Sequence, residues 1–218
     1  PTRGEFQIAS YNAYHQSGNQ DRFLREVKAQ QPAFVLLNEL NPGAELIQQF
    51  ADIYPYQTPC QQACHSLIFS TYPLRFSHDI ELHPGWGGKI VAGQALIPGL
   101  GPLNIVGAHT PAKIWQAQMN RRAKLVLDQV LRDLPVGKTL LIGDFNDVPW
   151  SRRMGQILRD HQLKSAFWPA GTWPRALGSW GVPIDAVFVS PQLRIEQTHA
   201  FSEETTSNHS ALFAQISW

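Results

Sequence analysis

The feature that most constrains the fold is an apolar run, residues 139–142, that ends in the segment Gly143-Asp144-Phe145-Asn146. β-Branched and aliphatic residues followed by glycine and polar groups are typical of a buried strand that delivers side chains to a sheet edge. Because a strand has a side-chain period of two, we expect Asp144 and Asn146 on one face and Phe145 on the other. A carboxylate beside an amide suits the binding of a water and a phosphate oxygen. An Asx-rich turn after a strand end explains the same residues equally well.

Other stretches show strand and helix patterns in alternation. The predicted strands are residues 6–12, 33–37, 66–71, 74–82, 89–97, 103–108, 183–190, 193–200 and 211–216. The predicted helices are residues 21–30, 41–51, 115–133 and 151–162, with Asp21, Asn41 and Ser151 as caps. The four strands between residues 66 and 108 indicate an antiparallel meander, and the aromatic-rich segment 168–183 is predicted to be a loop.

The longest predicted helix, residues 115–133, has an apolar face and a charged face. The residues expected to pack are Met119, Ala123, Val126, Val130 and Leu131. The residues expected to face solvent are Arg121, Arg122, Lys124, Asp128 and Arg132.

Two similar halves, each with strands and helices interleaved, favour one architecture. We expect an α/β fold, a four-layer sandwich in which two mixed β-sheets pack face to face with helices outside. At 218 residues the length fits one large domain or two small ones. No internal repeat or linker separates two parts of the sequence, so we expect a single domain over residues 1–218.

Composition excludes few functions. A net charge of +1 gives no strong field for polyanions, so any nucleic acid or phospholipid would have to be bound by local basic patches. No apolar run reaches the ~20 residues that cross a bilayer, which predicts a soluble chain. No obligate protein partner is evident from the sequence. Because the chain begins at Pro1 and not Met, we expect a processed product or an excised domain.

The two cysteines, Cys60 and Cys64, lie four residues apart with His65 beside them. A zinc site needs four ligands, so a local disulfide is the better interpretation, with two free thiols as the alternative.

Six predicted strands end in polar residues that could form one site. These are Asn12, Glu39, His109, Asp144 with Asn146, Asp185, and Asn208 with His209. The order of these residues and the local sequences around them resemble the endonuclease/exonuclease/phosphatase superfamily over nearly the whole chain. The segment 143–146 is a specific match, residues 184–190 match well, and residues 37–39 match more loosely. Residues 172–174 and 147–151 are most similar to a bacterial branch whose members are often membrane-anchored with an extracytoplasmic catalytic domain.

The resemblance implies a Mg²⁺-dependent phosphodiesterase, with Mn²⁺ as a possible substitute ion. Glu39, Asn12 and Asn208 would form the metal site. His109, Asp144, Asn146, Asp185 and His209 would be catalytic, with Asp185 orienting His209. Arg152, Arg153 and Trp173 are the candidates for substrate binding.

One position departs from the family pattern, which ends in Ser-Asp-His where this chain has Ser207-Asn208-His209. Asparagine keeps the oxygen ligand but loses the charge. The resemblance as a whole implies hydrolysis of phosphodiesters, with nucleic acid favoured as substrate. Phospholipid or small phosphoesters are the alternative substrates, and a non-catalytic phosphate-binding relative is the alternative function. An extracytoplasmic location is the favoured one.

Overall fold

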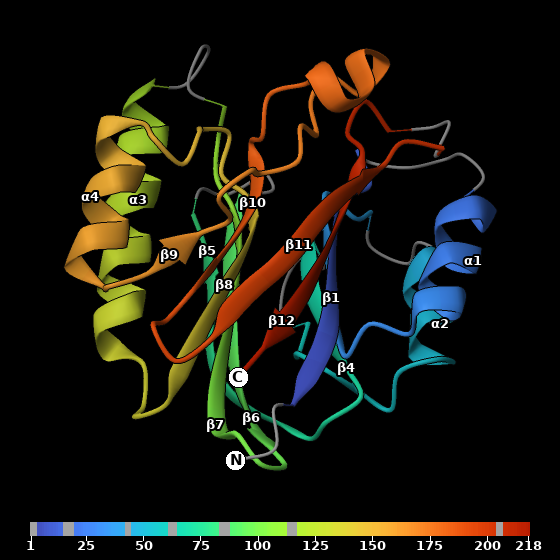
Figure 1. Ribbon diagram of the computed structural model, residues 1–218, viewed down its shortest axis with the longest axis horizontal. Helices are drawn as coiled ribbons and strands as arrows, with labels where there is room; N and C mark the ends of the chain where they lie inside the picture. The colour runs from blue at the N-terminus through green and yellow to red at the C-terminus, as the bar shows by residue number, and fades with distance from the viewer. Residues whose placement is uncertain are drawn as a thin grey trace.

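Two six-stranded sheets form the centre of the molecule (Figure 1). The computed structural model describes residues 4–14, 20–41, 45–60, 65–82, 88–112, 117–203 and 207–218. The first sheet has the order β11-β12-β1-β2-β4-β3 and contains β1 (Glu5–Asn12), β2 (Phe34–Asn38), β3 (Tyr56–Gln57), β4 (Ser66–Ser70), β11 (Arg194–Phe201) and β12 (Ala211–Ser217). The second has the order β5-β6-β7-β8-β10-β9 and contains β5 (Leu74–Glu81), β6 (Lys89–Ile97), β7 (Gly101–His109), β8 (Lys138–Asp144), β9 (Lys164–Ser165) and β10 (Asp185–Val189).

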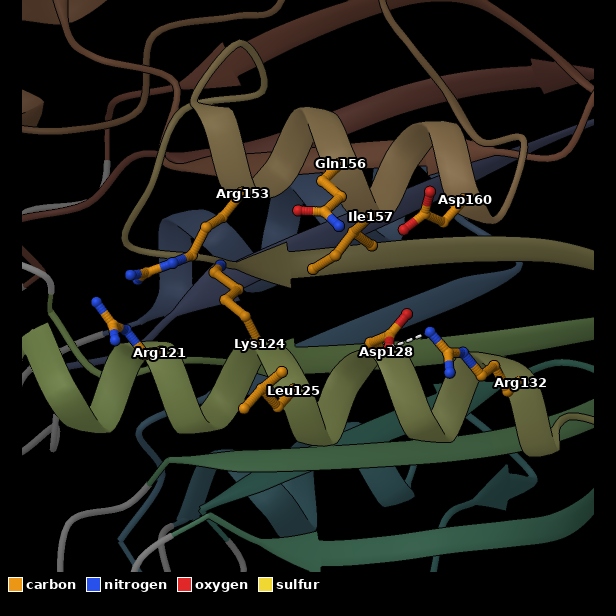
Figure 2. Close-up of a pocket in the computed structure, with 9 residues that line it drawn as sticks. All are labelled: Arg121, Lys124, Leu125, Asp128, Arg132, Arg153, Gln156, Ile157 and Asp160. Atoms are coloured by element: carbon orange, nitrogen blue, oxygen red, sulfur yellow. Dashed lines mark ion pairs between the residues drawn. The ribbon is translucent and has the colours of Figure 1, made fainter.

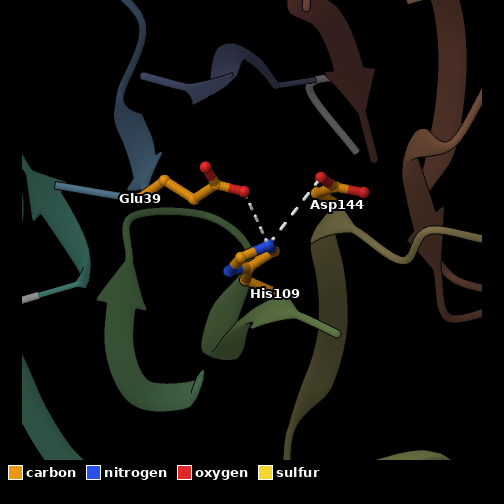
Figure 3. Close-up of side chains that lie close together, drawn as sticks. All are labelled: Glu39, His109 and Asp144. Carbon is orange, nitrogen blue, oxygen red and sulfur yellow. Dashed lines mark ion pairs between the residues drawn. The ribbon is translucent and has the colours of Figure 1, made fainter. Parts of the chain in front are cut away.

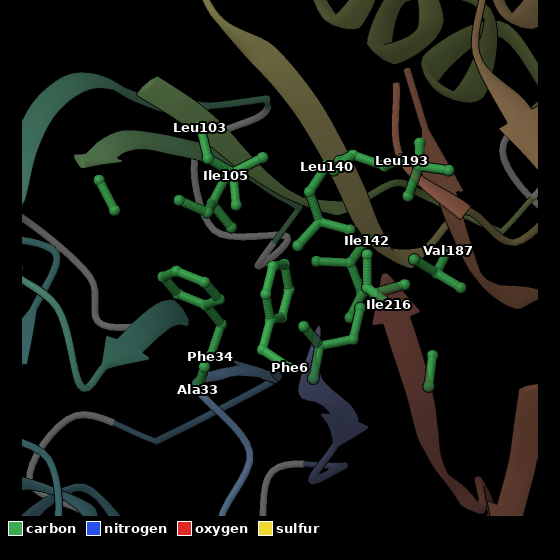
Figure 4. Packing of buried hydrophobic residues seen from close by; sticks show 14 of the residues in the cluster. Phe6, Ala33, Phe34, Leu103, Ile105, Leu140, Ile142, Val187, Leu193 and Ile216 are labelled. Carbon is green, nitrogen blue, oxygen red and sulfur yellow. The ribbon is translucent and has the colours of Figure 1, made fainter. Parts of the chain in front are cut away.

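Helices cover the outer face of each sheet, which confirms the four-layer α/β sandwich (Figure 1). The helices α1 (Asp21–Gln30) and α2 (Glu45–Ala51) cover the first sheet, and α3 (Ala117–Asp133) and α4 (Arg152–Asp160) cover the second. One apolar core lies between each helix pair and its sheet, and a third lies between the two sheets. Figure 4 shows this third core, where Phe6 and Phe34 of the first sheet face Leu103, Ile105 and Leu140 of the second.

Two parallel strand pairs bring the predicted polar residues to one end of the sandwich. In the first sheet β1 is parallel to β2, and Asn12 is paired with Asn38. In the second sheet β7 is parallel to β8, and His109 is paired with Asp144. The carboxyl ends of parallel strands meet at the same sheet edge. Asp185 joins this edge because it starts β10 opposite Asp144 in the antiparallel β8–β10 pair.

The close approach of the two sheets depends on a glycine. A Cβ on Gly107 of β7 would lie 2.6 Å from Leu36 Cδ1 and 3.1 Å from Val91 Cγ1. The absence of a side chain therefore lets β2 and β7 pack directly across the interface, below the edge where the polar residues lie.

The structure corrects two predictions about element boundaries and sheet membership. The predicted meander is split, because β4 belongs to the first sheet and only β5, β6 and β7 form consecutive antiparallel pairs in the second. The chain crosses between the sheets at Tyr72-Pro73, and proline removes the donor that would extend a ladder. The predicted loop 168–183 contains a short 3₁₀ helix, η1 (Arg175–Trp180).

The helices lie where they were predicted, but some of the predicted capping and first residues differ. Asp21 is the first helical residue of α1, and the N-cap residue, Gln20, makes no side-chain capping bond. Ser151 caps α4 as predicted, accepting a hydrogen bond of 3.2 Å from the Met154 amide. Helix α2 begins at Glu45, and the predicted proline start, residues 42–44, lies outside the described residues.

The inward face of α3 differs from the predicted one. Lys124, expected to be solvated, is 3% exposed, and Leu127 is fully buried, while Met119 and Val126 are only partly buried. Among the helices of the described chain, none is both long and apolar enough to cross a membrane. Cys60 is disulfide-bonded, and Cys64 lies outside the described residues.

Candidate active site

The candidate site lies between the two sheets at the carboxyl ends of their parallel strands. Strand alternation explains why its side chains point inward. Asn12 is on the same face of β1 as the core residue Ile8, and His109 is on the same face of β7 as Ile105. Asp144 follows Ile142 by two residues on β8. The apolar layer between the sheets is thus replaced by a polar layer at this end.

Glu39, His109 and Asp144 form the first group of this polar layer (Figure 3). His109 Nε2 lies 3.1 Å from Glu39 Oε1 and 4.0 Å from Asp144 Oδ2. Glu39 follows β2 directly and has a φ of 53°, a left-handed conformation that is uncommon for a side chain of this type. Such a conformation persists where its surroundings hold it, and here it aims the carboxylate across to the second sheet.

Asn12 donates hydrogen bonds to both carboxylates of this group. Its Nδ2 donates to Glu39 Oε1 at 2.9 Å and to Asp144 Oδ2 at 3.0 Å, while its Oδ1 accepts from the Tyr14 amide at 2.9 Å. The amide nitrogen therefore faces the carboxylates, and Asn12 positions Glu39 and Asp144. Direct metal ligation through Oδ1, as predicted from sequence, would require this amide to turn.

Asp144, Asp185 and His209 form the second group, which shares Asp144 with the first. His209 Nδ1 lies 2.8 Å from Asp185 Oδ2, and His209 Nε2 lies 3.8 Å from Asp144 Oδ2. The predicted contact between Asp185 and His209 is therefore present. It fixes the imidazole so that Nε2 points toward Asp144.

Two pKa values are shifted by this clustering. Burial and the neighbouring charge of Asp185 raise the pKa of Asp144, against the opposing effects of His209, His109 and the hydrogen bond from Asn12. Burial alone would lower the pKa of His209, but the charges of Asp185 and Asp144 and the hydrogen bond to Asp185 raise it to about 9. His209 is therefore an imidazolium at neutral pH in the absence of other ligands.

The loop that carries His209 is held by Ser207, part of the final motif, and by Arg175, which the sequence did not indicate. Ser207 Oγ donates to the Asn12 carbonyl at 2.7 Å and accepts from the His209 amide at 3.0 Å. Arg175 of η1 donates through Nε to the Ser207 carbonyl at 2.8 Å, and its amide donates to the Asn208 carbonyl at 2.8 Å. The interpretation of 168–183 as a plain loop missed this connection, because nothing in a local pattern pairs residue 175 with residue 207.

Asn146 does not lie on the strand as predicted. Strand β8 ends at Asp144, whose Oδ1 accepts a hydrogen bond of 2.9 Å from the Asn146 amide, an Asx turn. Asn146 has a φ of 45°, and its Nδ2 donates to the Thr110 carbonyl at 2.8 Å. Strand alternation therefore does not set the direction of the Asn146 side chain, and the structure has the Asx turn that was the alternative interpretation.

A buried cation supports this turn from behind. Lys124 Nζ donates to the Phe145 carbonyl at 3.0 Å and lies 3.4 Å from Thr110 Oγ1, which itself donates to the same carbonyl at 2.5 Å. Helix α3 thus fixes the segment between Asp144 and Asn146. The helical pattern placed Lys124 on the solvated face, and only the packed structure shows its contact with the turn.

The predicted substrate-binding residues fall in three environments. Arg153 lines a groove between α3 and α4, whereas Arg152 is exposed and does not line it (Figure 2). Trp173 is partly buried and pairs with Val182 in an isolated β-bridge. Asn208, predicted as a metal ligand, is exposed between the buried residues Ser207 and His209.

A second hollow, of about 530 Å³, is lined by aromatic rings near this edge. Its lining includes Trp150, Phe167 and Trp168, which are 68%, 88% and 81% exposed. Trp173, the aromatic residue chosen from sequence, is not among its lining residues.

The donor set fits a divalent ion of the Mg²⁺ type. In each group the ligand atoms lie within 4.8 Å of one another, and the two groups share the Asp144 carboxylate. Carboxylate oxygens from Glu39 and Asp144 are the hard donors that Mg²⁺ and Mn²⁺ take in proteins. Asp185 Oδ1 is buried and has no hydrogen-bond partner in the described part of the chain, which leaves one further oxygen available.

Comparison with known proteins identifies the class to which this fold and this site belong. The sequence profile of the Endonuclease/Exonuclease/phosphatase family matches residues 9–209. The chain therefore belongs to that family. A search of the curated proteins gives no match.

Solved structures with the same fold are distant in sequence. TDP2 of D. rerio, complexed with a single-strand DNA product, has a TM-score of 0.78 at 14% identity, covering 97% of this chain and 98% of that one. The human Nocturnin catalytic domain with a bound sulfate anion has a TM-score of 0.75 at 18% identity, covering 97% and 94%. A mannosyl-6-phosphatase of Bacteroides thetaiotaomicron has a TM-score of 0.73 at 14% identity, covering 97% and 99%.

Proposed function

We propose that this protein is a Mg²⁺-dependent phosphodiesterase and that nucleic acid is its favoured substrate. Membership of the family and the fold support metal-dependent phosphoester hydrolysis in general. The observation that carries the proposal is the convergence of Glu39, His109 and Asp144 with Asp185 and His209 at one sheet edge. Carboxylates and imidazoles in contact, largely buried, are the groups that phosphoester hydrolysis requires.

Each side chain has a proposed role in this chemistry. Glu39 and Asp144, positioned by Asn12, would hold the ion, which supplies charge neutralisation for the phosphoryl oxygens when bound. The Asp144 carboxylate, which belongs to both groups, would also position the attacking water and accept its proton. His209 is protonated at neutral pH, so it would donate to a phosphoryl oxygen, with Asp185 fixing its orientation.

His109 and Asn146 have supporting roles in the proposal. His109 Nε2 faces the same space as Glu39 and Asp144 and would bind the phosphate or protonate the leaving oxygen. Asn146 Nδ2 donates one N–H to the Thr110 carbonyl, and its second N–H would donate to a phosphoryl oxygen.

The test is hydrolysis of bis-nitrophenyl phosphate with and without Mg²⁺ or Mn²⁺, followed by a panel of DNA, RNA and sphingomyelin. We expect metal-dependent turnover and a preference for a nucleic acid. Glu39→Gln should lower metal-dependent turnover by at least roughly 100-fold with an unchanged circular dichroism spectrum, because the residue lies at a strand end and not in the core. Glu45→Gln, at an exposed position of α2, is the matched control. Full activity of Glu39→Gln would refute the assignment.

A non-catalytic phosphate-binding role is the second candidate, and one observation favours it. Asn208 replaces the aspartate of the family's final Ser-Asp-His motif, and residue 208 is exposed. Phosphate binding without turnover of any substrate in the panel would support this second role over the first.

We also propose an extracytoplasmic location. The disulfide at Cys60 supports it, because such bonds persist mainly in oxidising compartments. Cell fractionation with an alkylation assay of the thiols would test it, and free thiols in protein isolated from its native source would contradict it.

A further inference from the structure

The groove between α3 and α4 is a second place where charged side chains gather (Figure 2). It has a volume of about 170 Å³. Its lining residues are Arg121, Lys124, Leu125, Asp128, Arg132, Arg153, Gln156, Ile157 and Asp160.

Charge is divided along this groove. Figure 2 shows Arg121 and Arg153 extending toward the same end, while Asp128, Arg132 and Asp160 lie at the other. Asp128 forms an ion pair with Arg132 at 2.7 Å, and its Oδ1 lies 2.8 Å from His161 Nε2. In the described part of the chain neither Arg121 nor Arg153 forms an ion pair, and the two carboxylates of the groove, Asp128 and Asp160, lie at its other end (Figure 2).

The groove is connected to the candidate active site through Lys124, which lies behind the Asx turn of the site. Lys124 lines the groove on the same face of α3 as Arg121, one turn farther along, and its Nζ contacts the carbonyl of Phe145, the residue after Asp144. Arg153 lies in the first turn of α4, which follows the Asx turn of the site. Neither α3 nor α4 has an acidic residue in its first turn to offset this positive charge.

We propose that Arg121 and Arg153 bind a phosphate group, and that this is a second phosphate of the same substrate, beside the one that is cleaved. Arginine binds phosphate oxygens through a planar pair of donors, and two such groups at one hollow match a dianionic or bridging phosphate. The inference rests on the proposed function, and it selects substrates with successive phosphates, such as a nucleic acid strand, over those with one.

The experiment compares a substrate with one phosphate and a substrate with several. For Arg121→Gln/Arg153→Gln we expect KM for a short oligonucleotide to rise roughly 10-fold or more, with kcat and the KM for bis-nitrophenyl phosphate within about twofold of the unmodified protein. Arg132→Gln, at the opposite end of the groove, and Arg159→Gln, an exposed residue outside it, are single-charge controls and should leave both KM values unchanged.

Three results would overturn the proposal. An equal rise of KM for both substrates would show a general loss of the site, and no change of KM for either substrate would show that the two arginines bind neither. An unchanged oligonucleotide KM, together with an effect of free inorganic phosphate on reporter turnover that the double variant abolishes, would assign the groove to free phosphate.

A binding measurement separates this inference from the proposed function. Fluorescence anisotropy of a labelled oligonucleotide on the Glu39→Gln protein needs no turnover. The double substitution should weaken binding at least roughly 10-fold and lower the slope of log affinity against log salt by about 0.7 for each phosphate that the protein no longer neutralises. Equal affinity and equal slope with and without the two arginines would refute phosphate binding in the groove, even if the protein proves to be an active phosphodiesterase.

Discussion

The orientation of His209 in this site depends on Asp185. Asp185 Oδ2 holds His209 Nδ1 at 2.8 Å, and both side chains are nearly inaccessible to solvent. Residues that act as one unit lose their function together. We expect Asp185→Asn/His209→Ala to be little less active than the worse single variant. Turnover of all four proteins measures this in a double-mutant cycle, and fully additive losses would show that the two residues act independently.

Asn208 provides a test of charge at the edge of the site. Asn208→Asp adds a negative charge at the residue before His209. If position 208 contributes to the metal site, this charge should tighten Mg²⁺ binding despite solvent screening at an exposed position. The new carboxylate should also favour protonated His209 and so alter the pH dependence of turnover. Calorimetric metal titration of both proteins, with rate against pH, tests this. Equal affinities would show that position 208 is not a ligand and that its residue serves only the loop.

At the scale of elements, the packing of the end of β8 against β7 requires a glycine, Gly143. Gly143 has a φ of 150°, and a Cβ there would lie 1.9 Å from the Ala108 carbonyl oxygen of β7. No rotamer relieves a clash with backbone, so the two parallel strands would have to separate just below His109 and Asp144.

Gly143→Ala should therefore cost at least about 3 kcal/mol of unfolding free energy and abolish activity. Gly155→Ala is the matched control, because Gly155 lies inside α4, where the nearest atom to a new Cβ is the flexible Arg159 Nη1 at 3.3 Å. This control should be neutral or stabilising by up to about 1 kcal/mol. Urea unfolding of both variants decides the matter, and similar midpoints would contradict the backbone clash.

For the whole molecule, the buried site makes the stability of the metal-free protein depend on pH. His209 has a pKa of about 9 against its ordinary value of 6.5, so its protonation stabilises the fold fully below about pH 6.5 and this contribution is lost as pH rises through 9. Asp144 also has a raised pKa, and it acts with the same sign, since a raised pKa means that stability falls as pH rises.

We expect the unfolding free energy of the protein in chelator to fall by roughly 3 kcal/mol between about pH 6 and pH 10 through His209 alone. His209→Gln should remove most of this slope. Denaturant unfolding at several pH values is the measurement. A slope that is the same in both proteins would show that other groups carry the dependence.

The sequence alone determined the layered fold and most of the strand-end residues, because both follow from local periodicity. Apolar runs with polar ends indicated Asn12, Glu39, His109, Asp144, Asp185 and His209 as a set, and strand alternation suffices to point the strand-borne members toward one space. Helix positions were predictable for the same reason, since the 3.6-residue period and Ser151 are local signals.

Only the tertiary structure decided which residues contact one another and which surfaces are covered. The hydrogen bonds of Lys124 to the Phe145 carbonyl and of Arg175 to the Ser207 carbonyl join segments 21 and 32 residues apart, and no local pattern encodes such pairs. The assignment of β4 to the first sheet and the position of Arg121 and Arg153 at one groove have the same origin. Burial and charge balance are properties of the packed chain, because they depend on neighbours that sequence distance does not give.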